Sequence, residues 1–314
     1  MSIEHPTCCI AVDLGATQLR VGQVDADGTL LWRQAAPTAN TGNPQHVLEQ
    51  IRDLSAGYDF STASAMAVAA PGPLDTTSGS VRCIPTLSGW EDFPLRRAVE
   101  DYFHLPVLVE NDAIAATVGE WRFGAGSGYS NVVYLTISTG IGGGIIAGGA
   151  VVRGRRGFAG HLGHIGIDPY GDAICSCGAT GCFEALASGT ALGRRAQLLA
   201  ASNPNNSLHA FAASASAHDV AQAARRGAPE ALALMAEEGE FLGIGITSII
   251  HALSPDVVVL GGGVAQSFDL FETSMRAVLG SRLLPGFQEV LIAPAKLGDN
   301  AGLIGAASLF LDPA

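Results

Sequence analysis

The sequence of 314 residues has little positive charge and few charged residues of any kind. It holds 17 Lys and Arg against 29 Asp and Glu, so its formal net charge is −12 at pH 7. A protein that binds a phosphate backbone needs a basic patch that attracts it. The composition therefore argues against the nucleic-acid-binding classes, and we expect no nucleic-acid partner.

Long hydrophobic runs are also missing. No segment reaches the roughly 18 uninterrupted apolar residues that a membrane-spanning helix needs. The start of the chain, MSIEHPTCCIAVDLG, has no basic region followed by an apolar run and a small-residue cleavage site. We therefore expect a cytoplasmic protein that does not contact a membrane.

Cysteine is scarce, with six residues, and three of these, Cys8, Cys9 and Cys83, are scattered along the chain. Their spacing does not suggest the disulfide framework of a small secreted protein. Hydrophobic residues, by contrast, make up 48% of the chain, and there are 40 glycines. This length and composition can bury a large core, which we expect to be divided between two domains.

Residues 159–189 concentrate histidine, cysteine and glutamate between glycines. One histidine is followed by ten intervening residues and then by a C-x-C-x4-C pattern. One imidazole nitrogen and three thiolates form a complete tetrahedral ligand set for a structural Zn²⁺ ion. The predicted ligands are His164, Cys175, Cys177 and Cys182. The alternative is that the thiols are buried apolar side chains or a disulfide, and that the histidine is an ordinary core residue.

Two units of strand, turn and strand, at residues 8–25 and 131–149, have turns that contain glycine and threonine. In such a turn a carboxylate can face a metal-bound phosphate while backbone N–H groups face the phosphate oxygens. Two units of this kind suggest a duplicated fold with a nucleotide held between the halves. Each unit taken alone is equally compatible with an ordinary β-turn or glycine hairpin. The turn residues concerned are Asp13, Gly15 and Thr17 in the first unit and Thr139 and Gly140 in the second.

A further strand, within residues 105–124, runs directly into a helix, and Asn111 and Asp112 stand at the joint. Open α/β sheets bind ligands at the carboxyl ends of their strands. Asp112 could there accept a proton from a bound hydroxyl, while Asn111 orients a polyol. The alternative is that Asp112 is only the N-cap of the helix.

Three other loops have features of a binding site. Pro71-Gly72-Pro73 follows a buried strand and exposes its backbone. Thr86 and Trp90 either line a small polar pocket or belong to a surface loop with one anchoring Trp. A buried strand in residues 255–266 enters a glycine-rich turn that suits close approach of a flat base or ribose.

Helical periodicity predicts helices over residues 44–56, 190–201, 217–226 and 229–252.

Together these segments resemble the ROK family of sugar kinases and sugar-responsive repressors, from Asp13 to the last helix. The motifs that carry the resemblance are DLGATQ, APGP, ENDAIAATVGE, TISTGIGGG, AGHLGH, CSCGATGCFEALASG, VVLGGGV and NAGLIGAA. The resemblance implies an α/β, two-domain, actin-like ATPase (ribonuclease H-like) fold with a structural zinc knuckle, usually as a homodimer. We expect a smaller N-terminal domain over residues 1–118 and a larger C-terminal domain over residues 119–314, with the last helix packing back toward the N-terminal domain.

The resemblance also implies ATP-dependent transfer of a phosphoryl group to the 6-hydroxyl of a sugar bound in a closing cleft. Asp112 would be the general base that takes the proton from the attacking hydroxyl. Asp13 would help to hold Mg²⁺, and His164 would both ligate zinc and contact the sugar. The sugar-binding residues would be Gly72, Thr86, Asn111, Asp112, His161, His164 and Glu184. The residues at the nucleotide would be Asp13, Gly15, Thr17, Thr139, Gly140, Gly262 and Gly263.

Several positions depart from the family pattern. Ala16 and Gln18 replace a glycine and a lysine of the usual DxGGTK turn, which adds a methyl group and removes a charge near the phosphates. His161 replaces the glutamate of the usual AGExGH pattern, and a neutral imidazole offers one donor and one acceptor in place of a carboxylate. Bacterial N-acetylmannosamine kinases share this histidine, so we expect N-acetylmannosamine as the favoured substrate, with glucose or another hexose as the alternative.

Two other functional classes were weighed against a kinase. A repressor of the same family needs an N-terminal helix-turn-helix, and the first strand is expected to begin near Cys8, which leaves no room for one. A silent sugar-binding protein is compatible with Ala16 and Gln18. Retention of both Asp13 and Asp112 argues against that class, because a silent binder needs neither a metal carboxylate nor a base.

Overall fold

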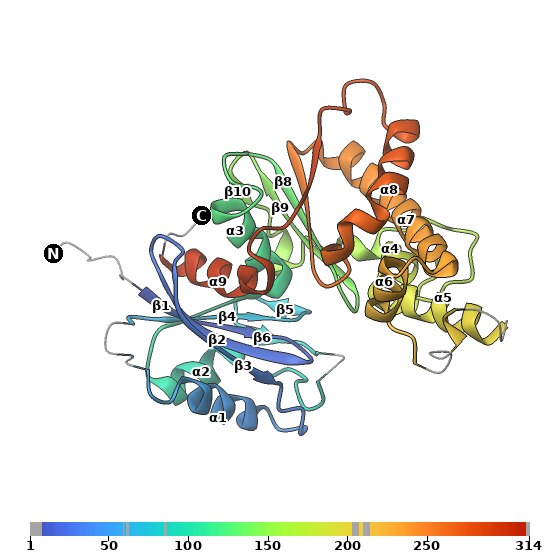
Figure 1. Cartoon of the computed structure of the whole chain (residues 1–314). Coiled ribbons are helices and arrows are strands. Elements are labelled where there is room, and N and C mark those ends of the chain that lie inside the picture. Colours follow the sequence, from blue (N-terminus) through green and yellow to red (C-terminus); the bar gives the residue numbers. More distant parts are fainter. Residues whose placement is uncertain are drawn as a thin grey trace. The chain divides into compact units, whose positions relative to one another are not determined.

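The computed structural model describes residues 8–58, 60, 63–84, 87–202, 207–209 and 214–311 (Figure 1). The chain forms two compact units. The first consists of Met1–Ser130, Gly144–Gly160 and Lys296–Ala314, and the second of Asn131–Gly143 and His161–Ala295. The chain therefore crosses between the units several times. The division into domains at residues 1–118 and 119–314 stays a prediction.

The first unit is built on a five-stranded sheet of order β3-β2-β1-β4-β7. The strands are β1 (Cys8–Leu14), β2 (Gln18–Asp25), β3 (Leu30–Pro37), β4 (Met66–Ala70) and β7 (Val107–Asn111). Strand β1 pairs antiparallel with β2 and parallel with β4, and β4 pairs parallel with β7. Because parallel strands end at the same edge, Asp13, Ala70 and Asn111 come together there: Asp13 is opposite Ala69, and Ala70 is opposite Asn111.

Alternation along β1 divides the core of this unit between the two faces of the sheet. Ile10 and Val12 belong to one hydrophobic cluster with residues of α1 (Pro44–Ser55) and α2 (Leu95–Phe103). Cys9 and Ala11 belong to a second cluster with residues of α3 (Asp112–Phe123) and α9 (Ala301–Leu311). Successive side chains of a strand point to opposite faces, which accounts for this division. A short hairpin of β5 (Leu74–Asp75) and β6 (Ser80–Val81) completes the unit.

Helices α3 and α9 pack closely because glycine stands where they touch. A Cβ atom on Gly305 would lie 1.7 Å from the carbonyl oxygen of Ala115, and one on Gly119 would lie 2.5 Å from that of Ala301. Neither distance is possible for a real side chain. Gly305 of the NAGLIGAA motif and Gly119 of the ENDAIAATVGE motif therefore serve helix packing.

The second five-stranded sheet has the order β10-β9-β8-β11-β12. Its strands are β8 (Val132–Ile137), β9 (Ile141–Ala147), β10 (Ala150–Val151), β11 (Val257–Gly261) and β12 (Leu291–Pro294). Strand β11 is parallel to both β8 and β12, and each of its residues is buried. A continuous apolar run such as VVVLG is typical of a parallel strand covered on both faces.

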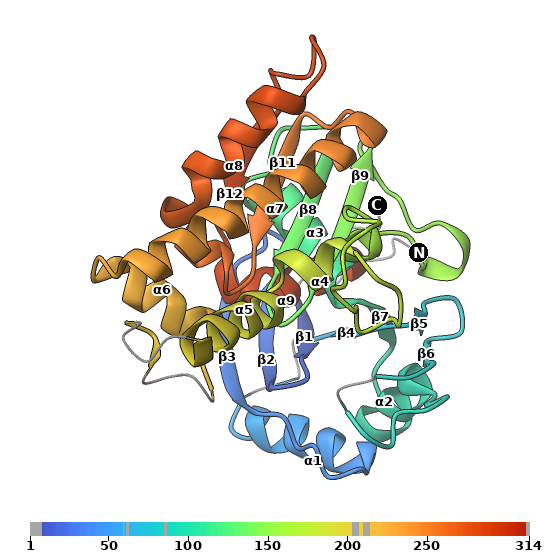
Figure 2. The same cartoon turned by 90° about the vertical axis from the view of Figure 1, so that its right-hand side faces the viewer.

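The helices of the second unit are α4 (Phe183–Ala187), α5 (Gly189–Ser202), α6 (Ala217–Arg225), α7 (Pro229–Leu253) and α8 (Phe268–Arg282). Helices α7 and α8 pack side by side (Figure 2). A Cβ on Gly239 would lie 2.4 Å from the Phe271 carbonyl oxygen, so a glycine is required at this crossing. Short 3₁₀ turns cover Arg155–Gly157 (η1), Leu162–His164 (η2), Ala265–Ser267 (η4) and Gly298–Asn300 (η5).

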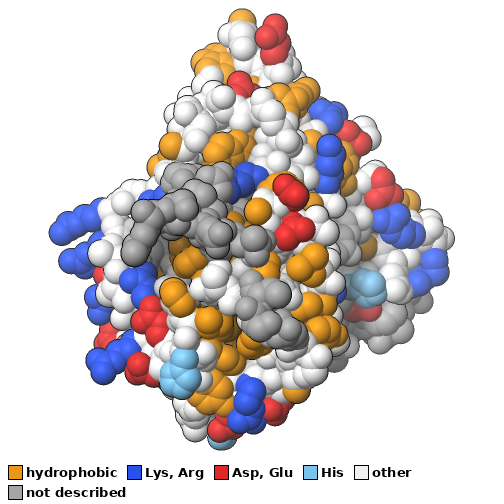
Figure 3. Space-filling view, turned by 90° about the vertical axis from the view of Figure 1, so that its left-hand side faces the viewer, with side chains coloured by type: hydrophobic (Ala, Val, Ile, Leu, Met, Phe, Trp, Pro, Cys, Tyr) orange, Lys and Arg blue, Asp and Glu red, His pale blue; other side chains and the backbone are white. Residues whose placement is uncertain are grey.

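The expected strands at the start of the chain and the expected helices are confirmed to within a few residues. The short β5–β6 hairpin and helix α2 were not anticipated. None of the helices in the described ranges is long and apolar enough to cross a membrane. Acidic and basic side chains both occur on the face shown in Figure 3.

Candidate active site and metal centre

Two acidic side chains lie at the carboxyl edge of the parallel strands of the first unit. Asp13 is near the end of β1, and Asp112 is the first residue of α3, directly after β7. Burial raises the pKa of Asp13 from its ordinary 3.8 to about 6; Arg20 opposes this shift, and the charge of Asp112 adds to it. Burial also raises the pKa of Asp112. Two partly desolvated carboxyls close enough to interact favour a bound cation between them.

Arg20 already places one cation beside Asp13. Its Nη1 donates a hydrogen bond of 3.1 Å to Asp13 Oδ2, and its Nη2 lies 3.7 Å from Asp299 Oδ2. The register of the β1–β2 hairpin puts Arg20 directly opposite Asp13. The sequence analysis did not identify Arg20 or Asp299. The hairpin register is the signal that could have found Arg20, since it is fixed by the short turn between the strands.

Asn111 caps helix α3. Its Oδ1 accepts hydrogen bonds from the backbone N–H groups of Ala113 at 3.1 Å and Ile114 at 3.2 Å. The alternative reading of Asp112 as the N-cap is therefore wrong, because the residue before it caps the helix. A Cβ atom on Gly72 would lie 3.4 Å from Asn111 Nδ2, so the predicted residues Gly72 and Asn111 are neighbours.

The turn between β1 and β2 is tight. The N–H of Gly15 donates to the carbonyl of Gln18 at 2.9 Å, and a Cβ on Gly15 would lie 2.8 Å from the same oxygen. Thr38 donates through its Oγ1 to the Gly15 carbonyl at 2.7 Å and so supports the turn from a neighbouring segment. The side chains of Thr17 and Gln18 are exposed. Both are therefore accessible to a ligand.

Because the pKa of Asp13 is raised, the ionised Asp13 side chain destabilises the folded protein at neutral pH. A carboxyl whose pKa is higher in the folded state contributes stability below about pH 4, and that contribution is lost as the pH rises through about 6. The shift from 3.8 to about 6 means that ionised Asp13 lowers the free energy of unfolding by roughly 3 kcal/mol at neutral pH. Replacing Asp13 removes this cost but also removes the ion pair with Arg20, so the net gain in stability is smaller. Asp13→Asn is therefore expected to stabilise the ligand-free protein by about 1 to 2 kcal/mol at pH 7.5.

Urea unfolding with a chelator present, at pH 7.5 and pH 4.5, measures this effect. The gain should shrink at the lower pH, where the wild-type carboxyl is protonated in the folded state. Asp92→Asn, a change at a mostly exposed side chain of the same unit, is the control. A lower stability of Asp13→Asn at pH 7.5 would contradict the prediction.

In the second unit, the four predicted metal ligands come together. Their ligand atoms all lie within 4.8 Å of one another. Cys177 Sγ and Cys182 Sγ are 3.8 Å apart, and Cys175 Sγ is 3.5 Å from His164 Nδ1. Two sulfurs on a tetrahedral Zn²⁺ with bonds of about 2.3 Å would be about 3.8 Å apart, and a sulfur and an imidazole nitrogen about 3.5 Å apart. The donor set and its spacing therefore fit zinc.

Of the alternatives to a metal site, a disulfide and a core histidine do not fit this arrangement, since His164 is exposed. Cys175 and Cys182 are buried, as the alternative of buried apolar thiols expects. All six cysteines are free, so the cluster contains no disulfide. Gly178 and Gly181 have φ values of +87° and +71°, which a residue with a side chain rarely adopts. A Cβ on Gly181 would also lie 1.7 Å from the Asp168 carbonyl oxygen. These two glycines allow the loop to turn tightly enough to bring the three thiols and the imidazole close together.

The predicted sugar-binding residues of this unit surround the cysteine cluster. The rings of His161 and His164, both exposed, are 6.1 Å apart between centroids and inclined by 24°. Glu184 Oε2 accepts the N–H of Ile141 at 2.9 Å, and its Oε1 accepts the hydroxyl of Ser176 at 2.7 Å. Glu184 thus ties α4 to the β8–β9 turn. A carboxylate has about four lone-pair sites, so Glu184 can still accept further hydrogen bonds.

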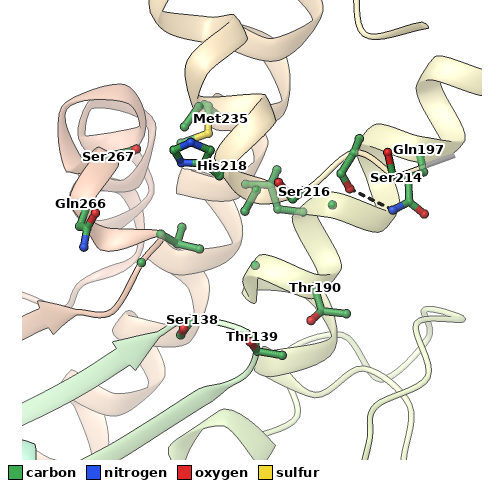
Figure 4. A pocket seen from close by; sticks show the side chains of 18 residues that line it. Ser138, Thr139, Thr190, Gln197, Ser214, Ser216, His218, Met235, Gln266 and Ser267 are labelled. Carbon is green, nitrogen blue, oxygen red and sulfur yellow. Dashed lines mark hydrogen bonds between the residues drawn. The ribbon is translucent and has the colours of Figure 1, made fainter. Parts of the chain in front are cut away.

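The second unit also contains a cavity of about 550 Å³ (Figure 4). Ser138 and Thr139 of the β8–β9 turn lie at one side of it, and His218 of α6 and Met235 of α7 lie at the other. Gly263 also lines it, so the cavity brings the predicted residues Thr139 and Gly263 together. A cavity of this size holds a drug-sized or nucleotide-sized molecule. The sequence analysis did not identify its α6 and α7 lining, since those residues form no motif.

Thr86 and Trp90 are the two residues of the predicted polar pocket. Thr86 lies outside the described residues, so its predicted sugar contact is not addressed by the structure. Trp90 is only 2% exposed and packs edge to face on Phe93, with ring centroids 5.2 Å apart. The reading of Trp90 as part of a polar pocket is therefore wrong, and its role is that of an anchor in the core.

Comparison with known proteins gives consistent matches over almost the whole chain. The model described as ROK family matches residues 9–313. A glucokinase of Streptomyces coelicolor is 34% identical over 313 residues, covering 97% of this chain and 98% of the relative. An N-acetylmannosamine kinase of Yersinia pestis is 32% identical over 302 residues, covering 95% and 96%.

Among solved structures, the chain is similar to a ROK family glucokinase from Streptomyces griseus in complex with glucose and AMPPNP. The TM-score is 0.84 at 35% identity, with 96% of this chain and 98% of that chain covered. This likeness supports the mixed α/β fold with two units that the resemblance implies.

Proposed function

This chain belongs to the ROK family, and we propose that it is an ATP-dependent sugar kinase. It transfers the γ-phosphoryl group of ATP to the 6-hydroxyl of a hexose or N-acyl hexosamine, with N-acetylmannosamine as the favoured substrate. The observation that carries this proposal is the pair of partly desolvated carboxyls, Asp13 and Asp112, at the carboxyl edge of β1 and β7. One serves the metal and the other the sugar.

Asp112 acts as the general base. Its raised pKa, caused by burial, brings a carboxyl closer to the range in which proton transfer at neutral pH is efficient. Asn111, held by its capping hydrogen bonds, presents its amide beside Gly72 and orients the sugar hydroxyls. The attacking hydroxyl gives its proton to Asp112 as its oxygen bonds to the γ-phosphorus, while the bond from the γ-phosphorus to the bridging oxygen breaks and ADP leaves with that oxygen. Phosphoryl transfer depends mainly on such positioning and on charge neutralisation.

Asp13 and the nucleotide phosphates would hold Mg²⁺, a hard cation that prefers carboxylate oxygens. When bound, Mg²⁺ supplies neutralisation of the charge that develops on the phosphoryl oxygens. Arg20 contributes a fixed positive charge at the same carboxylate. It stands close to the turn from which the usual lysine is missing at Gln18, and so offsets part of that loss.

The nucleotide lies in the cavity of the second unit. The cavity is lined by the β8–β9 turn, by the first turns of α5 and α6 and by Gly263. These segments offer backbone N–H groups and helix N-termini, which suit phosphate and ribose oxygens. The proposed nucleotide contacts of this unit are Thr139, Gly140, Gly262 and Gly263. The contacts proposed for the first unit, taken by itself, are Gly15 and Thr17.

His164, Cys175, Cys177 and Cys182 would hold a structural Zn²⁺. His164 Nδ1, the nitrogen that faces Cys175, would be the ligand atom, and a bound metal would restrain the imidazole there. The other edge of that ring is then oriented for a sugar hydroxyl. His161 and Glu184 complete the sugar contacts in this unit. The homodimer that the resemblance implies and the cytoplasmic location expected from the sequence stay predictions.

The choice of sugar rests on His161. An imidazole in place of a carboxylate changes which hydroxyl or N-acyl group can be satisfied, and an unpaired polar group in the site weakens binding. Glucose is the second candidate, favoured by the slightly higher identity to the glucokinase than to the N-acetylmannosamine kinase.

His161→Glu is expected to shift the preference toward glucose. The ratio of kcat/KM for N-acetylmannosamine over glucose should fall by about tenfold or more, because one exchanged hydrogen bond in a polar site is worth that much. ADP release with Mg-ATP across N-acetylmannosamine, N-acetylglucosamine, glucose, mannose, fructose and allose measures it in both proteins. His104→Glu, at an exposed helix end of the first unit, is a control for adding a carboxylate. An unchanged ratio would mean that His161 does not control selectivity.

A further inference from the structure

Three helices of the second unit meet around one arginine. Arg195 lies on α5, and its Nη2 is 2.5 Å from Glu238 Oε2 on α7. Its Nε is 2.9 Å from Glu237 Oε2, and its Nη1 donates to the carbonyl of Leu186 at the end of α4. The guanidinium also lies 5.1 Å from the centre of the Phe241 ring. One side chain thus holds α4, α5 and α7 together, and these helices are packed on one another (Figure 2).

The ion pair is buried. Glu238 is 0% exposed and the Arg195 side chain 17% exposed, and Glu238 Oε1 has no hydrogen-bond partner among the described residues. Burial raises the pKa of Glu238 to about 7, against the opposing charge of Arg195. A buried ion pair is weak evidence for stability, because a well-packed apolar pair of similar volume often does as well or better. The pair therefore calls for a role other than stability.

The junction that Arg195 fixes holds the β8–β9 turn, which lines the cavity. Glu184 of α4 accepts the N–H of Ile141 at one end of the turn. At the start of α5, the N–H of Gly189 donates to the Ser138 carbonyl at 2.7 Å. Ser188, between the two helices, accepts the N–H of Ala191 at 3.2 Å. Hydrogen bonds from α4 and from the start of α5 therefore hold the turn. Its position depends on the angle at which these helices meet.

Each partner of the ion pair lies about one helical turn further along its helix than a residue that lines the cavity. Arg195 is three residues after Leu192, and Glu238 is three residues after Met235; Leu192 and Met235 both line the cavity. Residues three apart lie on neighbouring positions of a helix surface. The ion pair therefore lies beside the residues of the cavity wall and does not itself line the cavity.

We propose that Arg195 is a positioning residue for the nucleotide: paired with Glu238, it fixes the α4–α5 junction and so holds the Ser138–Gly140 turn in place for the phosphates. This inference rests on the proposed function, since it assigns the cavity to ATP. Lysine can replace it only in part, because a single ammonium cannot reach Leu186, Glu237 and Glu238 together as the planar fork of an arginine does.

The test is the affinity for Mg-AMPPNP, measured by calorimetry, together with the thermal midpoint of each variant. Arg195→Met should weaken binding by about tenfold and lower the midpoint, since Glu238 loses its partner. The double variant Arg195→Met with Glu238→Met should recover the midpoint, because the charge pair is replaced by apolar volume, but should keep the weakened affinity. Arg195→Lys should fall between wild type and Arg195→Met in affinity.

Glu238→Gln against Glu240→Gln gives a matched pair on one helix, since Glu238 is buried and Glu240 exposed. Only the first should weaken nucleotide binding. A double variant that binds Mg-AMPPNP as tightly as wild type would overturn the inference and leave the proposed function intact. A wild-type protein that does not bind Mg-AMPPNP would overturn the proposed function, and this inference with it.

Discussion

Replacing Asp112 by Asn is expected to lower kcat by about a factor of 10³ while changing sugar affinity by no more than about twofold. The reason is that Asn keeps the size and hydrogen-bonding edge of the side chain but cannot take the proton of the attacking hydroxyl. Helix α3 should be intact, because its cap is Asn111 and not Asp112. Sugar-dependent ADP release gives the rate, and calorimetry with the sugar alone gives the affinity.

Asp101→Asn makes the same chemical change at an exposed side chain of the same unit and should behave as wild type. The two readouts together separate a lost base from a damaged site. Normal turnover in Asp112→Asn would remove this residue as the base. A parallel loss of sugar affinity would assign it to binding instead.

Removing the metal is expected to weaken sugar binding by roughly 10- to 100-fold. This is the range by which metal affinity or activity falls when a group that orients a metal ligand is lost. Cys177→Ser is the variant of choice, because Cys177 is exposed and its loss leaves no cavity in the core. Without zinc the His164 ring is no longer fixed through Nδ1, so its outer edge loses its orientation toward the sugar. Metal content by mass spectrometry and sugar affinity by calorimetry are measured on the same preparation.

Cys83→Ser is the matched control, since Cys83 is free and lies outside the cluster. It should keep about one zinc per chain and full sugar affinity. If metal-free Cys177→Ser bound sugar as tightly as the control, the proposed coupling through His164 would be wrong. If the wild-type protein contained no zinc at all, the assignment of the cluster would fall.

Local patterns were sufficient to predict most of the fold. The apolar run at Cys8 and the hydrophobic alternation after Gln18 give β1 and β2, and the run at Val257 gives β11. Apolar periodicity gives the long helix α7. The metal cluster was equally predictable, because ligand type and spacing are local properties of a single loop.

What the sequence did not reveal depends on contacts between distant segments. Arg20 faces Asp13 only through the register of a hairpin, and Arg195 reaches Glu238 over 43 positions of sequence. His218 reaches the cavity from a helix without a motif. Asp112 was open to two readings until the hydrogen bonds of Asn111 identified the cap.

The measurement that tests the central claim most directly is ³¹P NMR of the reaction with Mg-ATP and N-acetylmannosamine. The account predicts a new phosphate monoester whose phosphorus couples to the two protons at carbon 6, formed in step with ADP and absent with Asp112→Asn. Release of inorganic phosphate alone, or a phosphate ester at another position for every sugar in the panel, would contradict it.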